Sequence, residues 1–345
     1  MQRLQIKMSQ CRYSILLTPI ILWFTAVSSH ATLNVSCQAD MNPGVMVISN
    51  AITTANAESA SITGNLEYSC TNTGDTAGYV SVCLAADGGN TPNAVIPRYM
   101  NTASNTDKLA FDMTLLNGKT WGTRTSGLGE EYSSGEIYIP ARSTKLGQSN
   151  ISGQVVISTS LIPNKGNTLA TPGTYTNTFN GDLTFKAAEQ PSPIDCLNGA
   201  KDNSNPFSFT VQATVIPSCE ITAKPTDIDL KNIVASAIDT RGSTNISVSC
   251  TNGAPYTIGL APSNGNKNGT GIMTSTSSNS DMIPYQLQSI AGTVWGNTST
   301  AESVGNGVTG EGSGTTKVHT VYVVVPSADV KPGYYSDIVT ISLNY

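Results

Sequence analysis

Charged side chains are scarce in this chain. Asp, Glu, Lys and Arg make up 12% of its 345 residues, against roughly 25% in an average folded domain. The net charge is −5, and Lys and Arg form no cluster in the sequence. Because proteins bind nucleic acid through clustered Lys and Arg, we expect no nucleic-acid partner. The surface is expected to consist mostly of Ser, Thr, Asn and Gly.

Histidine is nearly absent as well. The chain contains two His, of which His319 alone lies beyond the first 31 residues, and it has no CxxC motif. Zinc sites and Ser-His-Asp triads depend on these residues. The sequence therefore predicts no metal, no cofactor and no enzyme of these kinds. An enzyme that uses carboxylates, such as a secreted carbohydrate-active enzyme, is not excluded by this argument.

Long apolar runs are missing except near the N-terminus. Residues 15–27 form one, and this run is too short to span a membrane comfortably. Three basic residues precede it: Arg3, Lys7 and Arg12. Ser29-His30-Ala31 follows it and fits a small-x-small cleavage site. This pattern predicts that residues 1–31 are a secretory signal peptide and that the protein is exported.

Helical periodicity is missing too. Short runs of alternating apolar and polar residues recur instead, separated by Gly, Asn, Pro and Ser, which is typical of β-sandwiches. Four landmarks occur twice in the same order, which indicates two copies of one all-β unit. They are Ser36-Cys37 and Ser218-Cys219, Cys70-Thr71-Asn72 and Cys250-Thr251-Asn252, Trp121-Gly122 and Trp295-Gly296, and Pro172-Gly173 and Pro332-Gly333.

The cysteines fit this repeat. Seven are present, and Cys11 lies in the predicted signal peptide. An even number in an exported chain favours disulfides, here three. The predicted pairs, two from the repeat and the last by elimination, are Cys37–Cys70, Cys219–Cys250 and Cys83–Cys196. We interpret all three as structural staples.

Two strands are expected from alternating apolar side chains. The closing strand of the second unit carries Val339, Ile341, Leu343 and Tyr345, a set that should face the core and line any groove there. The segment 207–216, which precedes the second Ser-Cys landmark, carries Phe207, Phe209, Val211, Ala213 and Val215. No comparable segment stands between residue 31 and Cys37. The chain thus has two units but one strand of this second type.

These motifs, together with the ending 330–345, resemble the spore coat protein U domain family. That family includes pilins of the archaic (Csu-type) chaperone–usher pili. The resemblance is clear over 207–345 and weaker but collinear over 32–187, and the two-domain length is similar to that of a tip subunit. It implies immunoglobulin-like β-sandwich domains that each lack one strand. In the family, a periplasmic chaperone and then a neighbouring pilin supply the missing strand.

On this basis we expect segment 207–216 to be a donor strand that closes the first domain, 32–206, within the same chain. The second domain, 207–345, would stay incomplete and accept a strand from the chaperone or from the adjacent pilin, with assembly at an outer-membrane usher. Residues 32–36 are too few to serve another subunit well. The expected location is therefore the pilus tip, at the cell surface, reached through the periplasm.

Two alternatives stay open. If segment 207–216 is merely the first strand of the second domain, both domains are self-contained. The chain is then a secreted coat-type structural protein. The carbohydrate-active enzyme is the third hypothesis.

The resemblance also implies attachment to a biotic or abiotic surface, and biofilm formation, through apolar loops of the first domain. The candidate adhesive residues are Val95, Ile96, Pro97, Leu161, Ile162 and Pro163. The alternative is that they pack inward at strand ends. For Trp121 we favour a core position over a sugar-stacking role, because Trp295 occupies the matching place in the second unit.

Overall fold

The computed structural model describes residues 31–123, 127–191, 194–198, 203–276, 279–300 and 303–345. Over these ranges the chain forms β-strands and a single short 3-10 helix, η1 (Asn167–Leu169), which confirms the all-β prediction. No helix in the described part of the chain is long and apolar enough to cross a membrane. The predicted signal peptide lies outside the described residues, apart from its last residue.

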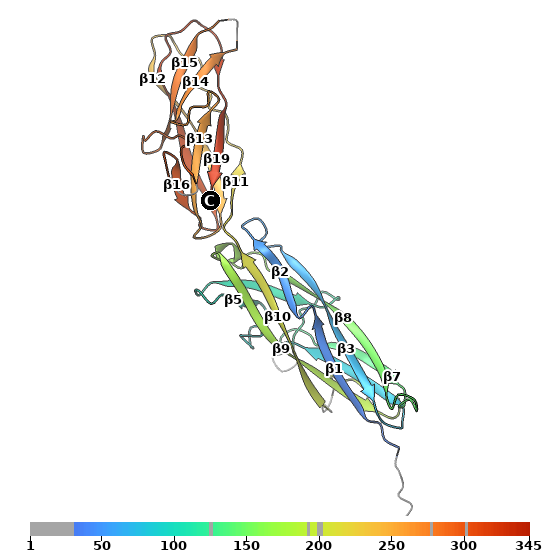
Figure 1. Ribbon diagram of the computed structural model, residues 1–345. Helices are drawn as coiled ribbons and strands as arrows, with labels where there is room; N and C mark the ends of the chain where they lie inside the picture. The colour runs from blue at the N-terminus through green and yellow to red at the C-terminus, as the bar shows by residue number, and fades with distance from the viewer. Residues whose placement is uncertain (1–30, 124–126, 192–193, 199–202, 277–278, 301–302) are drawn as a thin grey trace, which may run out of the picture.

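The strands form two elongated domains that follow one another end to end (Figure 1). The first domain contains β1 (Val35–Asn42), β2 (Val45–Ile52), β3 (Ser61–Asn72), β4 (Gly78–Ala85), β5 (Arg98–Asn101), β6 (Lys108–Thr114), β7 (Tyr132–Ile139), β8 (Ser149–Leu161), β9 (Gly173–Ala188) and β10 (Asn203–Val215). The second contains β11 (Cys219–Ala223), β12 (Ile238–Cys250), β13 (Pro255–Pro262), β14 (Thr270–Ser275), β15 (Met282–Ser289), β16 (Val308–Glu311), β17 (Thr316–Ser327), β18 (Tyr335–Ser336) and β19 (Val339–Asn344).

The strands of the first domain belong to one sheet that wraps around a common core. Its order is β1-β3-β8-β6-β5-β9-β10-β2, and β4 pairs with both β7 and β9. The chain changes layers between β1 and β2, because β1 pairs with β3 whereas β2 pairs with β10. In this way β10, which is late in the sequence, comes to lie between β9 and β2.

The second domain has two sheets around a core of its own. One has the order β11-β12-β17-β15-β14-β18, and the other has the order β16-β13-β19. Buried apolar residues alternate at Ile246, Val248 and Cys250 of β12 and at Val321, Val323 and Val325 of β17, whereas β13 is buried on both faces between Tyr256 and Leu260. This is the two-layer sandwich that the sequence predicts.

The repeated tryptophans hold equivalent core positions. The indole Nε1 of Trp121 donates to the carbonyl oxygen of Leu84 at 2.9 Å, and Nε1 of Trp295 donates to the carbonyl oxygen of Ile258 at 2.8 Å. Both side chains are at most 1% exposed. The core interpretation of Trp121 is confirmed, and a sugar-stacking role is ruled out for a ring that is fully covered.

The short segment 216–218 joins the two domains. Thr251 Oγ1 donates to the carbonyl oxygen of Ile216 at 2.9 Å. Asn252 Nδ2 donates to the carbonyl oxygen of Leu169, at the end of η1, at 2.6 Å. These bonds hold the adjoining ends of the two domains against each other.

Candidate functional site

Strand β10 lies inside the sheet of the first domain. It pairs antiparallel with β9 from Asn203↔Phe185 to Val215↔Gly173, and parallel with β2. Its inward side chains are each at most 5% exposed: Phe207, Phe209, Val211, Ala213 and Val215. The five residues that we predicted as a donor strand therefore contribute one side of the core of the first domain.

The aromatic rings of β10 pack against β9 and the buried tryptophan. The ring of Phe209 stacks on Phe179 at 4.7 Å and on Trp121 at 5.9 Å between centroids. The ring of Phe207 stacks on Trp121 at 6.5 Å. It also covers Gly181, where an added Cβ atom would lie 2.3 Å from the ring. The glycine thus leaves the space that the Phe207 ring fills.

The second domain repeats this arrangement up to the position of β10. Its sheet β16-β13-β19 corresponds to β7-β4-β9 in the first domain. Strand β19 pairs with β13 on one side, from Thr257↔Asn344 to Pro262↔Val339. Within the described ranges, no strand pairs with the other edge of β19. That edge therefore presents backbone groups without a ladder partner.

A groove of about 710 Å³ runs along this edge of β19. Core side chains of the second domain, among them Leu260, Leu287 and Val321, line it although each is at most 5% exposed. Its walls include Lys224, Pro225, Thr226, Asp227, Ile228 and Leu230 on one side and Val339 and Ile341 on the other. The interior of the second domain is therefore open along the line that β10 occupies in the first.

The wall opposite β19 is the counterpart of β2. Strand β1 leads through Pro43 into β2, which buries Met46 and Ile48. Strand β11 leads through Pro225 into segment 227–234, where Ile228 and Leu230 pack against the core. This segment forms no strand. In the first domain, β10 supplies the hydrogen-bonding partner that makes β2 a strand.

A carboxylate and a phenol lie inside the groove. Tyr285 Oη donates to Asp337 Oδ2 at 2.6 Å, and Ser263 Oγ also donates to this carboxylate. Burial, with the hydrogen bond and the negative charge of Asp337 as further causes, raises the pKa of Tyr285 well above its usual value. The phenol is therefore neutral at physiological pH. Asp337 is already satisfied, so an incoming strand need not supply it with a donor.

Of the four residues that we predicted to face the core and line the groove from the closing strand, only some do so. Val339, Ile341 and Leu343 pack against the second core, and the first two line the groove. Tyr345 does not: it follows the end of β19 and is 60% exposed. Its prediction as a groove-lining residue is wrong, because pairing with β13 ends at Asn344.

The predicted adhesive loops also need correction. Val95 is fully buried and Leu161, the last residue of β8, is 2% exposed, so neither side chain is available to a surface. The guanidinium of Arg98 holds the first loop inward, since it donates to the carbonyl oxygens of Asp87 at 2.8 Å and of Val95 at 3.4 Å.

The other four candidate residues of these two loops differ in their exposure to solvent. Ile96 is 57% exposed, and Pro163 is exposed, whereas Pro97 and Ile162 are half-buried. The stretch 161–163 leads towards η1, which contacts the second domain. The six candidates therefore do not form one exposed apolar patch.

Two exposed apolar side chains at the opposite end of the first domain were missed. Tyr138 on β7 is 55% exposed, and Leu146 in the following loop is 79% exposed. This loop lies beside the one after β3, since Arg142 N donates to the carbonyl oxygen of Gly74 at 2.9 Å. The available signal was a single Leu in the otherwise polar stretch 143–150.

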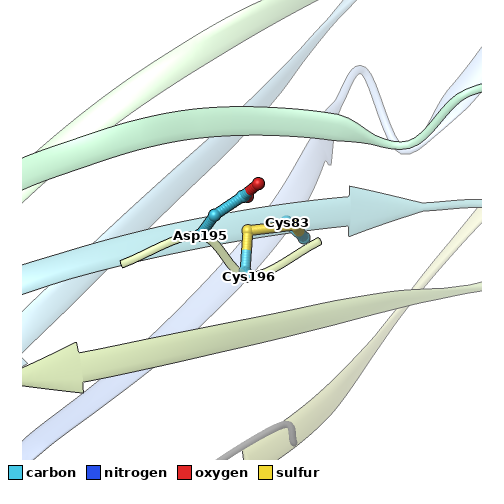
Figure 2. A group of neighbouring side chains, drawn as sticks. All are labelled: Cys83, Asp195 and Cys196. Carbon is cyan, nitrogen blue, oxygen red and sulfur yellow. A yellow bond between two sulfur atoms is a disulfide. The ribbon is translucent and has the colours of Figure 1, made fainter. Parts of the chain in front are cut away.

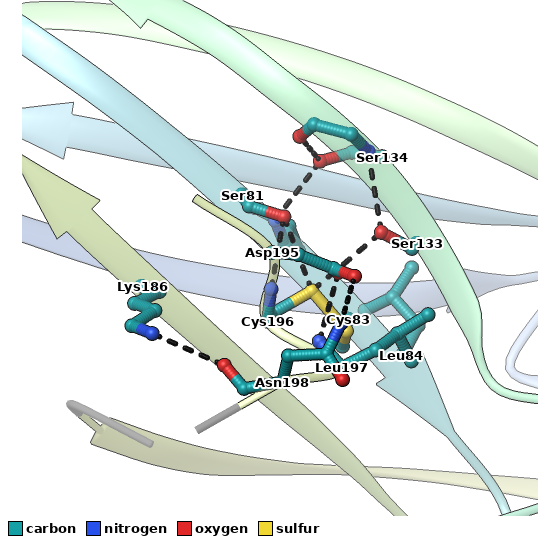
Figure 3. Close-up of a disulfide and its surroundings, with 12 residues drawn as sticks. Ser81, Cys83, Leu84, Ser133, Ser134, Lys186, Asp195, Cys196, Leu197 and Asn198 are labelled. Atoms are coloured by element: carbon teal, nitrogen blue, oxygen red, sulfur yellow. Dashed lines mark hydrogen bonds between the residues drawn. A yellow bond between two sulfur atoms is a disulfide. The ribbon is translucent and has the colours of Figure 1, made fainter. Parts of the chain in front are cut away.

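The three disulfides have the predicted pairing: Cys37–Cys70, Cys83–Cys196 and Cys219–Cys250. The Cys83–Cys196 bond attaches the segment after β9 to β4 (Figure 3). Ser81 supports it, because its Oγ donates to the Cys196 sulfur at 3.2 Å and accepts from the Cys196 backbone N at 3.2 Å.

Asp195 stands beside this disulfide and makes the group look like a metal site (Figure 2). The two sulfurs are bonded to each other, so they are not thiolate ligands. The Asp195 carboxylate accepts from Leu197 N and from Asn198 Nδ2, each at 2.9 Å. We therefore interpret the group as a stapled turn.

Comparison with known proteins gave one family match. Residues 205–342 match the family model of the Spore Coat Protein U domain. A search of the curated proteins found no match.

Solved structures with a similar fold include proteins of bacterial pili. The CsuC–CsuE chaperone–tip adhesion subunit complex from the archaic chaperone–usher Csu pili of Acinetobacter baumannii is 14% identical, with 90% of this chain and 100% of that chain covered and a TM-score of 0.48. The CupB6 tip adhesin from Pseudomonas aeruginosa is 11% identical, with 91% and 94% covered and a TM-score of 0.38.

CfaE, the adhesive subunit of the CFA/I fimbria of enterotoxigenic Escherichia coli, is 11% identical, with 87% and 92% covered and a TM-score of 0.34. These three structures contain a tip adhesion subunit, a tip adhesin and an adhesive subunit, respectively. The family match over residues 205–342 covers the second domain, so it is this part of the chain that is similar to the Spore Coat Protein U domain.

Proposed function

We propose that this chain is a subunit of a chaperone–usher pilus and that its second domain accepts a strand from another protein. The observation that carries the proposal is the groove beside β19, at the position that β10 fills in the first domain. The resemblance to archaic pilins supports the choice of partners. The first partner is a periplasmic chaperone. The second partner is the adjacent pilin, whose strand replaces that of the chaperone at the outer-membrane usher.

The groove offers an incoming strand two sources of affinity. The edge of β19 and the segment 227–234 provide backbone partners on its two sides, as β9 and β2 do for β10. Core side chains at the bottom of the groove provide apolar contact. Each large apolar donor residue buried there contributes about 1.5–3 kcal/mol.

The first domain is the adhesive part in this proposal. Its sheet is filled by β10, so the place of a foreign donor strand is taken by the chain itself. Its end far from the second domain presents Tyr138 and Leu146. We place this end outermost, at the pilus tip, where apolar contacts attach the fibre to a surface and support biofilm formation.

Co-expression with and without a cognate chaperone tests the role of the groove. With the chaperone, we expect a soluble complex of the two proteins in the periplasm. Without it, the open core should cause degradation or aggregation. If the chain alone accumulates to the same level as a stable monomer, the proposal fails and a self-contained coat-type structural protein is the better interpretation.

Attachment of piliated cells tests the role of the outer end. The variant with both Leu146→Ser and Tyr138→Ser should attach less to an apolar surface while pili are still assembled, as counted by electron microscopy. The matched control is Leu116→Ser, because Leu116 is 80% exposed and lies in a different loop. Unchanged attachment of the double variant would remove this end from the adhesive role.

A further inference from the structure

Strands β9 and β19, which flank the donor position in the first and second domains, differ at the residue that faces Phe207 in the first domain. In the first domain, Phe207 pairs with Gly181 in the register of β10 and β9. Its ring lies where a side chain at residue 181 would begin, since an added Cβ atom would be 2.3 Å from the ring. Phe207 in its present position is therefore compatible with glycine there and incompatible with a larger residue.

Ile341 occupies the corresponding position in β19. Leu84 and Ile258 are equivalent, because each accepts the indole hydrogen bond of its domain. Leu84 pairs with Leu183, and Ile258 pairs with Leu343. Gly181 and Ile341 each precede these partners by two residues. The repeated Pro-Gly landmark gives the same alignment.

Two differences between β9 and β19 change the shape of the groove. Ile341 lines the groove and packs against the second core, so its branched side chain fills the space that the Phe207 ring has in the first domain. Two residues earlier in the same strands, the second domain has the smaller side chain. Phe179, whose ring stacks on Phe209, is replaced by Val339. The groove therefore has less room opposite Ile341 and more room opposite Val339.

We propose that the groove selects a strand with Gly, Ala or Ser opposite Ile341 and a large apolar residue two positions later, opposite Val339. The order follows from the antiparallel register of β10 on β9. This inference rests on the proposed function and defines the side-chain pattern of the partner. The β10 sequence of a second copy has Phe at both positions, so one copy of this chain is a poor donor for another.

The test uses the full chain with a donor strand tethered behind Tyr345 by a flexible linker. One donor copies residues 203–215. A second carries Phe207→Ala in the tethered copy, and a third carries Phe209→Ala there as the matched control. Each donor is also tethered to acceptors with Ile341→Ala and Ile341→Gly. The melting temperature of the second domain is compared with that of the same acceptor without a donor.

In the wild-type groove, the Phe207→Ala donor should give a melting temperature at least about 4 °C higher than the unchanged copy. The Phe209→Ala donor should stabilise less than the Phe207→Ala donor. With Ile341→Gly or Ile341→Ala, the advantage of the Phe207→Ala donor should shrink or reverse. Equal stabilisation by the unchanged copy in the wild-type groove overturns the inference and leaves the proposed function standing. Absence of stabilisation by every donor overturns the proposed function.

Discussion

Among the residues of β10, Phe209 has the densest aromatic surroundings. Its ring is stacked between Phe179 and Trp121 and is 3% exposed. Ser208, its neighbour, points to the solvent from the other face of the strand. Substitutions at these two positions therefore distinguish the contribution of the buried face of β10 from that of its exposed face.

We expect Phe209→Ala to lower the free energy of unfolding of the first domain by about 3–5 kcal/mol, because it leaves a cavity in a packed core. Ser208→Ala should change it by no more than about 0.5 kcal/mol. Urea denaturation followed by tryptophan fluorescence measures both. Similar small effects of the two substitutions would contradict the role of β10 in this core.

His319 gives the second domain a dependence on pH. Its Nε2 lies 2.7 Å from Tyr256 Oη. Burial, and then the positive charge of Lys317, lower the pKa of His319 below its usual 6.5. The unfolded chain then binds the proton more readily than the folded one, so stability is complete above the unfolded pKa and decreases as the pH falls below it.

The melting temperature of the second domain should therefore fall between about pH 7 and about pH 5. His319→Gln should reduce this fall, because the glutamine cannot be protonated in that range. Calorimetry of both proteins across this range provides the measurement. A pH dependence that is the same in the two proteins would show that other groups cause it.

At the scale of elements, segment 227–234 and β2 hold equivalent positions in the two domains but differ in secondary structure. Both carry apolar residues at alternate positions, yet β2 is a strand and 227–234 is not. The difference is β10, which pairs with β2 over Thr210↔Val45 to Val215↔Ile52. Segment 227–234 therefore has the pattern of a strand and lacks its partner.

We predict that a donor strand or chaperone in the groove protects the backbone amides of 227–234 from hydrogen exchange. Exchange measured by mass spectrometry, with and without the bound partner, tests this. Residues 247–249 of β12 are the internal control, because they are already paired on both sides, by β11 and by β17. Unchanged exchange in 227–234 would mean that the partner does not form a strand next to it.

Sequence patterns predicted those features that leave a local or repeated signal in the sequence. The alternation from Phe207 to Val215 predicted β10, and the repeated cysteines predicted their own pairing. They did not predict that 227–234 is irregular, because Ile228 and Leu230 alternate like Met46 and Ile48. For Val95 the alternative of inward packing is the correct one, and the hydrogen bond from Arg98 to its carbonyl oxygen, which no local pattern shows, accompanies this burial.

At the scale of the whole molecule, two cores are connected by the short link 216–218. Strand β10 completes the sheet of the first domain, and the Cys83–Cys196 bond closes a loop over a sequence separation of 113 residues there. The second domain has an open groove and a bond over a separation of 31 residues. The chain-entropy model assigns more stabilisation to the longer loop.

We therefore expect two unfolding transitions, with the second domain unfolding at the lower denaturant concentration. Phe209→Ala should shift the transition of the first domain to a lower urea concentration. A strand bound in the groove should shift the transition of the second domain to a higher urea concentration. Urea unfolding followed by separate probes for the two tryptophans, Trp121 and Trp295, assigns each transition. A single transition in which both probes change together would contradict this independence.

The course of β10 also determines how the molecule responds to pulling. This strand runs from Asn203 to Val215 and continues directly into the link between the domains. Tension between the domains therefore acts along the axis of β10. Its hydrogen bonds to β9 and β2 are then loaded together in shear, instead of opening one after another from an end. A subunit held at its outer end and drawn at the other by flow would resist extension through the full length of this one strand.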